Sequence, residues 1–127
     1  MILERTLTIT MNKDWRRFLA EAGKRASTAA KSGKYQGETL NFESPGAFFG
    51  QLTELRWEMT RELMGAGVVG VRELARRLGR DVRRVHQDAQ ALVELGLLER
   101  DETGALLCPY ADIHVDVHLS SNLRKAA

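Results

Sequence analysis

The sequence predicts an α+β fold that is mainly helical, and the centre of the chain carries this prediction. A short apolar-periodic segment over residues 71–78 meets a break at Gly79–Asp81, and a longer one runs over residues 82–95 and ends at Gly96. Segments with alternating apolar residues lie before and after this pair, as in short strands. Two helices joined by a short Gly-containing turn form a helix-turn-helix, which we expect here.

The first 43 residues are expected to form an arm with the order strand, helix, strand. Leu3, Leu7 and Ile9 alternate with threonines, which is typical of a strand. Asn12 is a residue type that caps helices. Apolar residues follow it at spacings of three and four, which predicts one helical stripe: Trp15, Phe18, Leu19, Ala22 and Ala26. Residues 38–42 are predicted to form the second strand.

Two helices are predicted between the arm and the helix-turn-helix. Ser44 followed by Pro45 indicates a helix start, with a capping side chain and a proline at the first helical position. Thr53 is expected to cap the next helix, over residues 54–64. Residues 44–119 would then form one domain of helices, a hairpin and a final strand, followed by a frayed tail at 120–127.

The predicted helix over residues 82–95 has two different faces. At 100° per residue, an apolar set falls on one side: Val82, Val85, Ala89, Leu92 and Val93. A basic and amide-rich set falls on the other: Arg83, Arg84, Gln87, Gln90 and Ala91. Asp81 is placed to cap this helix. His86 lies at the border of the apolar face, where we expect it to pack against a neighbouring helix or to bond to the backbone, with DNA contact as the alternative.

Positive charge is concentrated on this unit. From Arg72 to Gln87, six arginines stand against two acidic residues, a local excess of +4 in a chain whose net charge is +2. Arginine binds guanine edges and glutamine binds adenine edges bidentately. The predicted base-reading residues are Arg83, Arg84, Gln87 and Gln90, and the predicted phosphate contacts are Arg72, Arg76 and Arg80. We therefore predict sequence-specific binding to double-stranded DNA.

A hairpin is predicted directly after the second helix. Residues 97–100 and 105–108 have the composition of two short strands, and Gly104 in the turn between them can take a positive φ. A hairpin in this position is a wing. Its tip carries Asp101 and Glu102, which phosphates would repel, so we expect the wing to stand off the DNA with Arg100 as its one contact.

The run RELARRLGRDVRRVHQDAQALVELGLLERDETGALLCPY resembles the winged helix-turn-helix regulators of the broad MarR/ArsR-like superfamily. With Phe42-Glu43-Ser44 and Arg56-Trp57-Glu58 before it, the region 38–119 is similar to small prokaryotic regulators that often act as antitoxins of toxin–antitoxin pairs. The resemblance implies a transcriptional regulator, an autoregulating repressor, with a cognate toxin as a partner. The chain departs from the pattern at Gly70, where the superfamily usually has a capping Ser or Thr.

The oligomeric state and the role of the arm leave alternatives open. Two recognition helices on one pseudo-palindromic site favour a homodimer, with the arm and the final strand as its interface. Alternatively, the arm packs against the winged domain of its own chain. A second class of function is a protein-interaction module that neutralises a toxin through the arm, with DNA binding secondary. The arm then supplies the basic surface that matters: Arg16, Arg17, Lys24 and Arg25.

The remaining sequence features argue against several other classes of function. Residues 112–119 alternate as a strand, with His114, Asp116 and His118 on one face, but no fourth zinc ligand is evident, so we expect no metal or other cofactor. The single cysteine, Cys108, cannot form an internal disulfide, which fits the reducing cytoplasm. No apolar run is long enough for a membrane span, and no catalytic motif is present, so we expect neither membrane association nor enzymatic activity.

Overall fold

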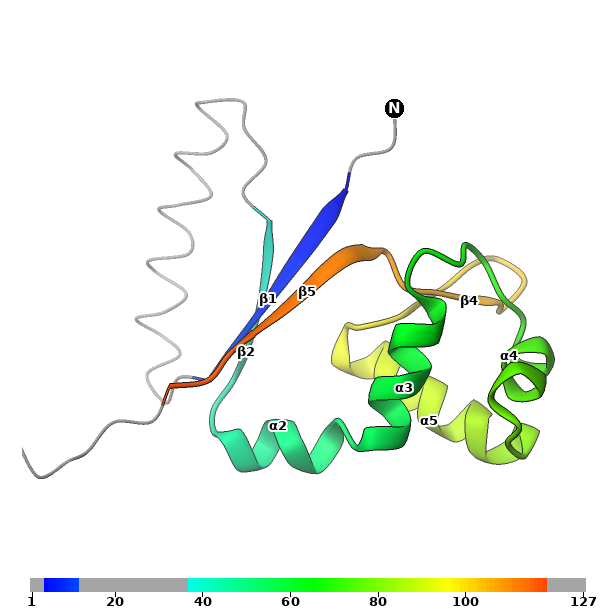
Figure 1. Cartoon of the computed structure of the whole chain (residues 1–127), viewed down its shortest axis with the longest axis horizontal. Coiled ribbons are helices and arrows are strands. Elements are labelled where there is room, and N and C mark those ends of the chain that lie inside the picture. Colours follow the sequence, from blue (N-terminus) through cyan, green and yellow to red (C-terminus); the bar gives the residue numbers. More distant parts are fainter. Residues whose placement is uncertain (1–3, 12–36, 119–127) are drawn as a thin grey trace, which may run out of the picture.

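The computed structural model describes residues 4–11 and 37–118 of this 127-residue chain. They form an α+β fold, so the predicted class is confirmed (Figure 1). In chain order the elements are β1 (Arg5–Met11), β2 (Glu38–Phe42), α2 (Pro45–Gln51), α3 (Glu54–Leu63), α4 (Val71–Leu78), α5 (Val82–Leu95), β3 (Glu99–Arg100), β4 (Leu106–Leu107) and β5 (Tyr110–Asp116). The helix predicted around Trp15–Ala26 and the tail at 120–127 lie outside the described residues.

The helices begin where the sequence supplies capping side chains. Ser44, Thr53 and Asp81 each accept a hydrogen bond from the backbone amide three residues later, at 3.1, 3.4 and 3.3 Å. A cap of this kind stabilises a helix by about 1 kcal/mol. Helix α4 begins after Gly70, which has no side chain to provide such a cap, as the sequence indicates. The bounds of α4 and α5 are those predicted, and α3 ends one residue earlier than expected.

Two glycines end the helices of the central pair. Gly79 has φ 63° and Gly96 has φ 92°, in the left-handed region that other residues adopt at a cost of about 1–2 kcal/mol. After Gly79 the backbone needs only Arg80 and Asp81 before α5 begins, so the two helices are joined by a short, defined turn. Figure 1 shows α4 at the end of the molecule farthest from the three-stranded sheet.

The three-stranded sheet has the order β2-β1-β5, and both pairings of β1 are parallel. In this register Ile9 lies opposite Leu40 on one side and Val115 on the other, so these apolar residues share one face. The final strand was predicted over residues 112–119, but it begins at Tyr110 and ends at Asp116. Its start is earlier because Tyr110 already pairs with Arg5 of β1.

Among the described residues, a second, antiparallel sheet pairs β3 with β4 and forms the predicted hairpin after α5. Glu99 pairs with Leu107 and Arg100 with Leu106. An isolated bridge between Val69 and Leu106 attaches this hairpin to the segment before α4. The strands of this hairpin are shorter than predicted, with two residues in each.

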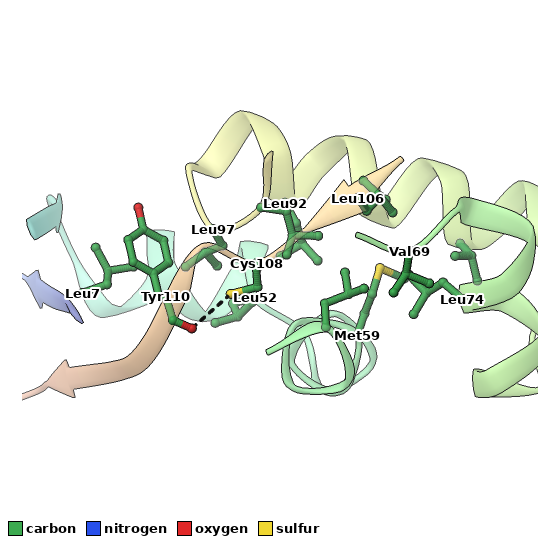
Figure 2. Packing of buried hydrophobic residues seen from close by; sticks show 14 of the residues in the cluster. Leu7, Leu52, Met59, Val69, Leu74, Leu92, Leu97, Leu106, Cys108 and Tyr110 are labelled. Atoms are coloured by element: carbon green, nitrogen blue, oxygen red, sulfur yellow. Dashed lines mark hydrogen bonds between the residues drawn. The ribbon is translucent and has the colours of Figure 1, made fainter. Parts of the chain in front are cut away.

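One hydrophobic cluster joins the strands to the helices. Leu7 and Ile9 of β1 are buried with residues from α3, α4, α5 and the hairpin, and Figure 2 shows several of them around Leu92 and Met59. The described strands of the arm therefore pack with the helical half of their own chain. Cys108 lies in this cluster, and burial raises the pKa of its thiol, which points to a packing role and not to a reactive one.

A polar cluster around Arg5 holds the two sheets together. The Arg5 guanidinium donates hydrogen bonds to Glu38 of β2 at 2.6 Å and to Glu99 of β3 at 3.5 Å, and it lies 5.1 Å from the centroid of the Tyr110 ring. The hydrogen bond to Glu38 raises the pKa of Arg5 above its usual value. The Tyr110 hydroxyl donates to the Gly96 carbonyl at 3.3 Å, so the same cluster reaches the end of α5.

Candidate nucleic-acid interface

The two faces of α5 differ as the sequence predicts. Val85, Ala89 and Leu92 are completely buried, and Val93 is half-buried. The basic and amide side chains on the opposite side are exposed: Arg83, Arg84, Gln87 and Gln90. Since α5 is held through its apolar face, Arg83, Arg84 and Gln87 are available to a partner. Gln90 is also exposed, but its side chain hydrogen-bonds to Glu94 and Arg100.

Two expectations at the start of α5 are wrong. Val82 was assigned to the apolar face, but this residue is 41% exposed because the first turn of α5 extends beyond the core. His86, one turn later, was expected to pack against a neighbouring helix or to bond to the backbone. Its exposure contradicts the packing role and leaves the alternative of DNA contact open. Both residues therefore add to the open surface of α5.

An open hollow of about 850 Å³ lies where the starts of α4 and α5 meet. It is lined by Val71, Arg72, Asp81, Val82, Arg83 and His86. The structure thus brings together Arg72, predicted to hold phosphate, and Arg83, predicted to read bases. Val82 lines the same hollow as these two cationic residues, so the hollow offers both charge and apolar contact.

The exposed arginines at the end of α4 already have an acidic partner. Glu73 accepts hydrogen bonds from Arg76 and from Arg77, the latter at 3.1 Å. The hydrogen bonds from Arg76 and Arg77 lower the pKa of Glu73 to about 2. Arg76 is exposed, so it can exchange this carboxylate for a phosphate, but only in competition with Glu73.

Arg80 is not positioned to contact phosphate, although the sequence predicts this contact. Its guanidinium donates to Asp88 of α5 at 2.7 Å, its side chain is only 18% exposed, and its Nη1 atom is buried. Asp88 also accepts from Arg56 of α3, at 3.1 Å. The guanidinium of Arg80 therefore faces inward and fixes the turn before α5, which removes it from the set of candidate phosphate ligands.

The network of Arg56, Asp88 and Arg80 was not predicted from the sequence. Burial alone would raise the pKa of Asp88, but the hydrogen bonds from Arg80 and Arg56 outweigh it and hold the pKa below its usual value. A signal was present in the sequence. Asp88 lies three residues after Val85 and four before Leu92, at the edge of the apolar face, where a carboxylate needs cationic partners.

The hairpin contacts α5 through Arg100. This side chain donates to the Gln90 side-chain oxygen at 3.2 Å and to the Gly104 carbonyl at 2.9 Å. The structure thus brings Arg100 and Gln90 together, and their polar groups are partly used within the chain.

The acidic tip of the hairpin has a structural use. The carboxylate of Asp101 accepts hydrogen bonds from the Thr103 hydroxyl and from the amides of Thr103 and Ala105, at 2.6, 2.9 and 2.9 Å. The bond from the Thr103 hydroxyl is the main reason why the pKa of Asp101 is low. Its charge therefore stabilises the turn.

The described residues contain neither a metal-binding cluster nor a membrane-spanning helix. Within residues 4–11 and 37–118, no group of three or more His, Cys, Asp or Glu side chains is arranged to hold a metal ion, and His114, Asp116 and His118 are included in that range. Across the same part of the chain, no helix combines the length and the apolar character that a membrane span requires.

Comparison with known proteins gives a match to a family model. The model of the HVO_A0114 family matches residues 51–115, from the last residue of α2 almost to the end of β5. No curated protein and no solved structure matches the chain. Since the match covers just over half of the sequence, including α3, the α4–α5 pair and the hairpin, the chain belongs to the HVO_A0114 family.

Proposed function

We propose that this protein is a sequence-specific double-stranded DNA-binding protein, a transcriptional regulator that acts as a homodimer. In this proposal α4, α5 and the hairpin are a winged helix-turn-helix, and α5 lies in the major groove. The observation that carries the proposal is the face of α5 that its packing leaves exposed, with Arg83, Arg84 and Gln87 on it. These side chains match the donor and acceptor patterns of guanine and adenine in that groove.

The contacts that these side chains make within the chain suggest a separate role in DNA binding for each of them. Arg83, Arg84 and Gln87 would read bases, while Arg72 and Arg76 would hold phosphates. Val82 offers an apolar contact for a thymine methyl group. Gln90 and Arg100 would need to give up their mutual hydrogen bond to reach DNA, so we place them at the margin of the interface.

The experiment that tests this proposal is a gel shift on the DNA upstream of the protein's own gene. Excess random duplex serves as competitor, and the titration is repeated at two salt concentrations. Binding that resists the competitor and selects one sequence supports an autoregulating repressor. Binding that vanishes with competitor or modest salt would reflect only a basic surface and would refute the proposal.

The alternative function is that of an antitoxin, which mainly neutralises a protein partner through its arm. This function depends on residues outside the described part of the chain. Its basic surface, Arg16 to Arg25, lies there. A failed gel shift would make this class the next to test, by isolating the protein with the product of a neighbouring gene.

Removal of the carboxylate of Glu73 should strengthen DNA binding. Glu73→Gln frees Arg76 and Arg77 from their ion pairs and removes a negative charge near the proposed phosphate contacts. Affinity for duplex DNA is expected to rise about 3- to 10-fold at low salt, with a steeper salt dependence, because each freed arginine can displace a DNA counterion. Fluorescence anisotropy with a labelled duplex measures both quantities.

The control for this prediction is Glu62→Gln, which removes an exposed carboxylate from α3. We expect it to change the affinity less than Glu73→Gln. Equal gains for the two variants would show that only net charge matters and that α4 is not at the DNA.

A further inference from the structure

Strand β5 lies at the outer edge of the three-stranded sheet. In the described part of the chain the order is β2-β1-β5, so the side of β5 away from β1 has no strand beside it. In Figure 1 the orange strand β5 runs along the side of the sheet nearest α3. Edge strands are commonly protected from pairing by Lys or Pro, and residues 110–118 contain neither.

The sequence of this edge complements itself when it is read in the antiparallel direction. With Val115 opposite Val115 of a second copy, His114 lies opposite Asp116, and Asp112 lies opposite His118. An imidazole can donate a hydrogen bond to a carboxylate in either charge state. All four polar residues are exposed, so their side chains can make these cross-strand pairs: Asp112, His114, Asp116 and His118.

The two registers in which the two-fold axis moves by one residue are unfavourable. If the two-fold axis moved to His114, Asp112 would face Asp116. If it moved to Asp116, the two copies of that residue would face each other. Like charges directly opposite destabilise a strand pair, and a shift by an odd number of residues would bring polar side chains onto the apolar face.

The other face of the same pairing covers apolar surface. Side chains that lie opposite each other in adjacent strands project from the same face of the sheet. Ile113 of one copy would therefore meet Val117 of the other. This contact would form on the face of the sheet that is turned toward the helices. Val117 is 47% exposed and Trp57 of α3 is 40% exposed. An open hollow of about 340 Å³ beside Val115 is lined by Phe48, Phe49, Leu52, Glu54 and Trp57. The partner's valines would enter this hollow.

We infer that the edge of β5 binds a second copy of this chain through antiparallel β5–β5 pairing centred on Val115. The two sheets then form one continuous sheet across a two-fold axis, with four His–Asp pairs on its polar face. The inference specifies the interface of the homodimer in the proposed function, but it rests on β5 and α3 and not on the DNA-binding residues.

The test is an exchange of charge partners, with the dimer dissociation constant measured by sedimentation equilibrium without DNA. His114→Asp places a carboxylate opposite Asp116 at two symmetric positions, and it should raise the dissociation constant about 10-fold or more. The double variant His114→Asp with Asp116→His restores a His–Asp pair at both positions, so it should return to within about 3-fold of the unmodified protein. Thr39→Asp adds a carboxylate to an exposed position of β2, at the opposite edge, and should leave the constant unchanged.

Three results would overturn the inference. They are a monomeric unmodified protein at tens of micromolar, a dimer that is insensitive to His114→Asp, and a double variant that stays as weak as the single one. Circular dichroism of every variant establishes that the fold is retained. A dimer with these properties that fails to bind DNA would refute the proposed function and leave the interface standing.

Discussion

Replacing Asp88 with asparagine is expected to lower the free energy of unfolding by about 2–4 kcal/mol. The Asp88 carboxylate is the shared partner of Arg56 and Arg80, and the three side chains are only 18–22% exposed. An amide in its place leaves two half-buried guanidinium groups without a counter-charge. Urea unfolding followed by circular dichroism gives the free energy directly.

The matched control is Glu58→Gln, which neutralises an exposed carboxylate on α3 and should change stability by less than about 0.5 kcal/mol. If Asp88→Asn is as mild as this control, the network does not stabilise the fold, and Arg80 returns to the set of candidate phosphate ligands.

The same network predicts a pH dependence with a defined sign. The pKa of Asp88 is lower in the folded protein than the ordinary value of 3.8, so its contribution is fully present above that value. The contribution is lost as the pH falls from 3.8 through the folded-state pKa. Stability between about pH 5 and pH 2 should therefore fall less steeply in Asp88→Asn than in the unmodified protein.

Replacing Arg84 and Gln87 together with alanine is expected to weaken binding to the preferred DNA site about 30-fold or more. Each bidentate base contact contributes about 1–3 kcal/mol of discrimination, and both side chains are exposed on the same face of α5. Binding to random duplex should change much less, because most of that affinity comes from phosphate contacts. Anisotropy titrations on both DNAs, at one salt concentration, give the specificity ratio.

A comparison variant, Arg61→Ala, removes one exposed positive charge from α3. It should leave the specificity ratio unchanged, since it lies outside the proposed reading face. If the double variant keeps the full ratio, α5 does not read the bases through Arg84 and Gln87. The face centred on Val82, Arg72 and His86 would then be the next surface to substitute.

Local signals explain which elements could be predicted. The bounds of α4 and α5 follow from Asp81 and from Gly79 and Gly96, whose preferred conformations are set within a few residues of the chain. The exposed position of Arg83, Arg84 and Gln87 follows from helical periodicity alone.

Long-range contacts explain what the sequence could not reveal. The pairing of Leu7 with both Glu38 and Ile113 joins segments far apart in the chain, and no local pattern specifies it. The burial of Arg80 depends on the position of Arg56 in another helix. Val82 was misassigned because periodicity gives the side of a helix on which a residue lies but not how far along that side the core extends.

The central place of β1 in the sheet has a consequence for synthesis of the protein. This strand is made first among the described elements, and one of its two neighbours, β5, is made last. Until β5 has been synthesised, Leu7 and Ile9 can be covered on only one flank. Pairing over so long a chain separation closes slowly, so the helices should form early and the sheet should be completed only after translation has passed residue 116.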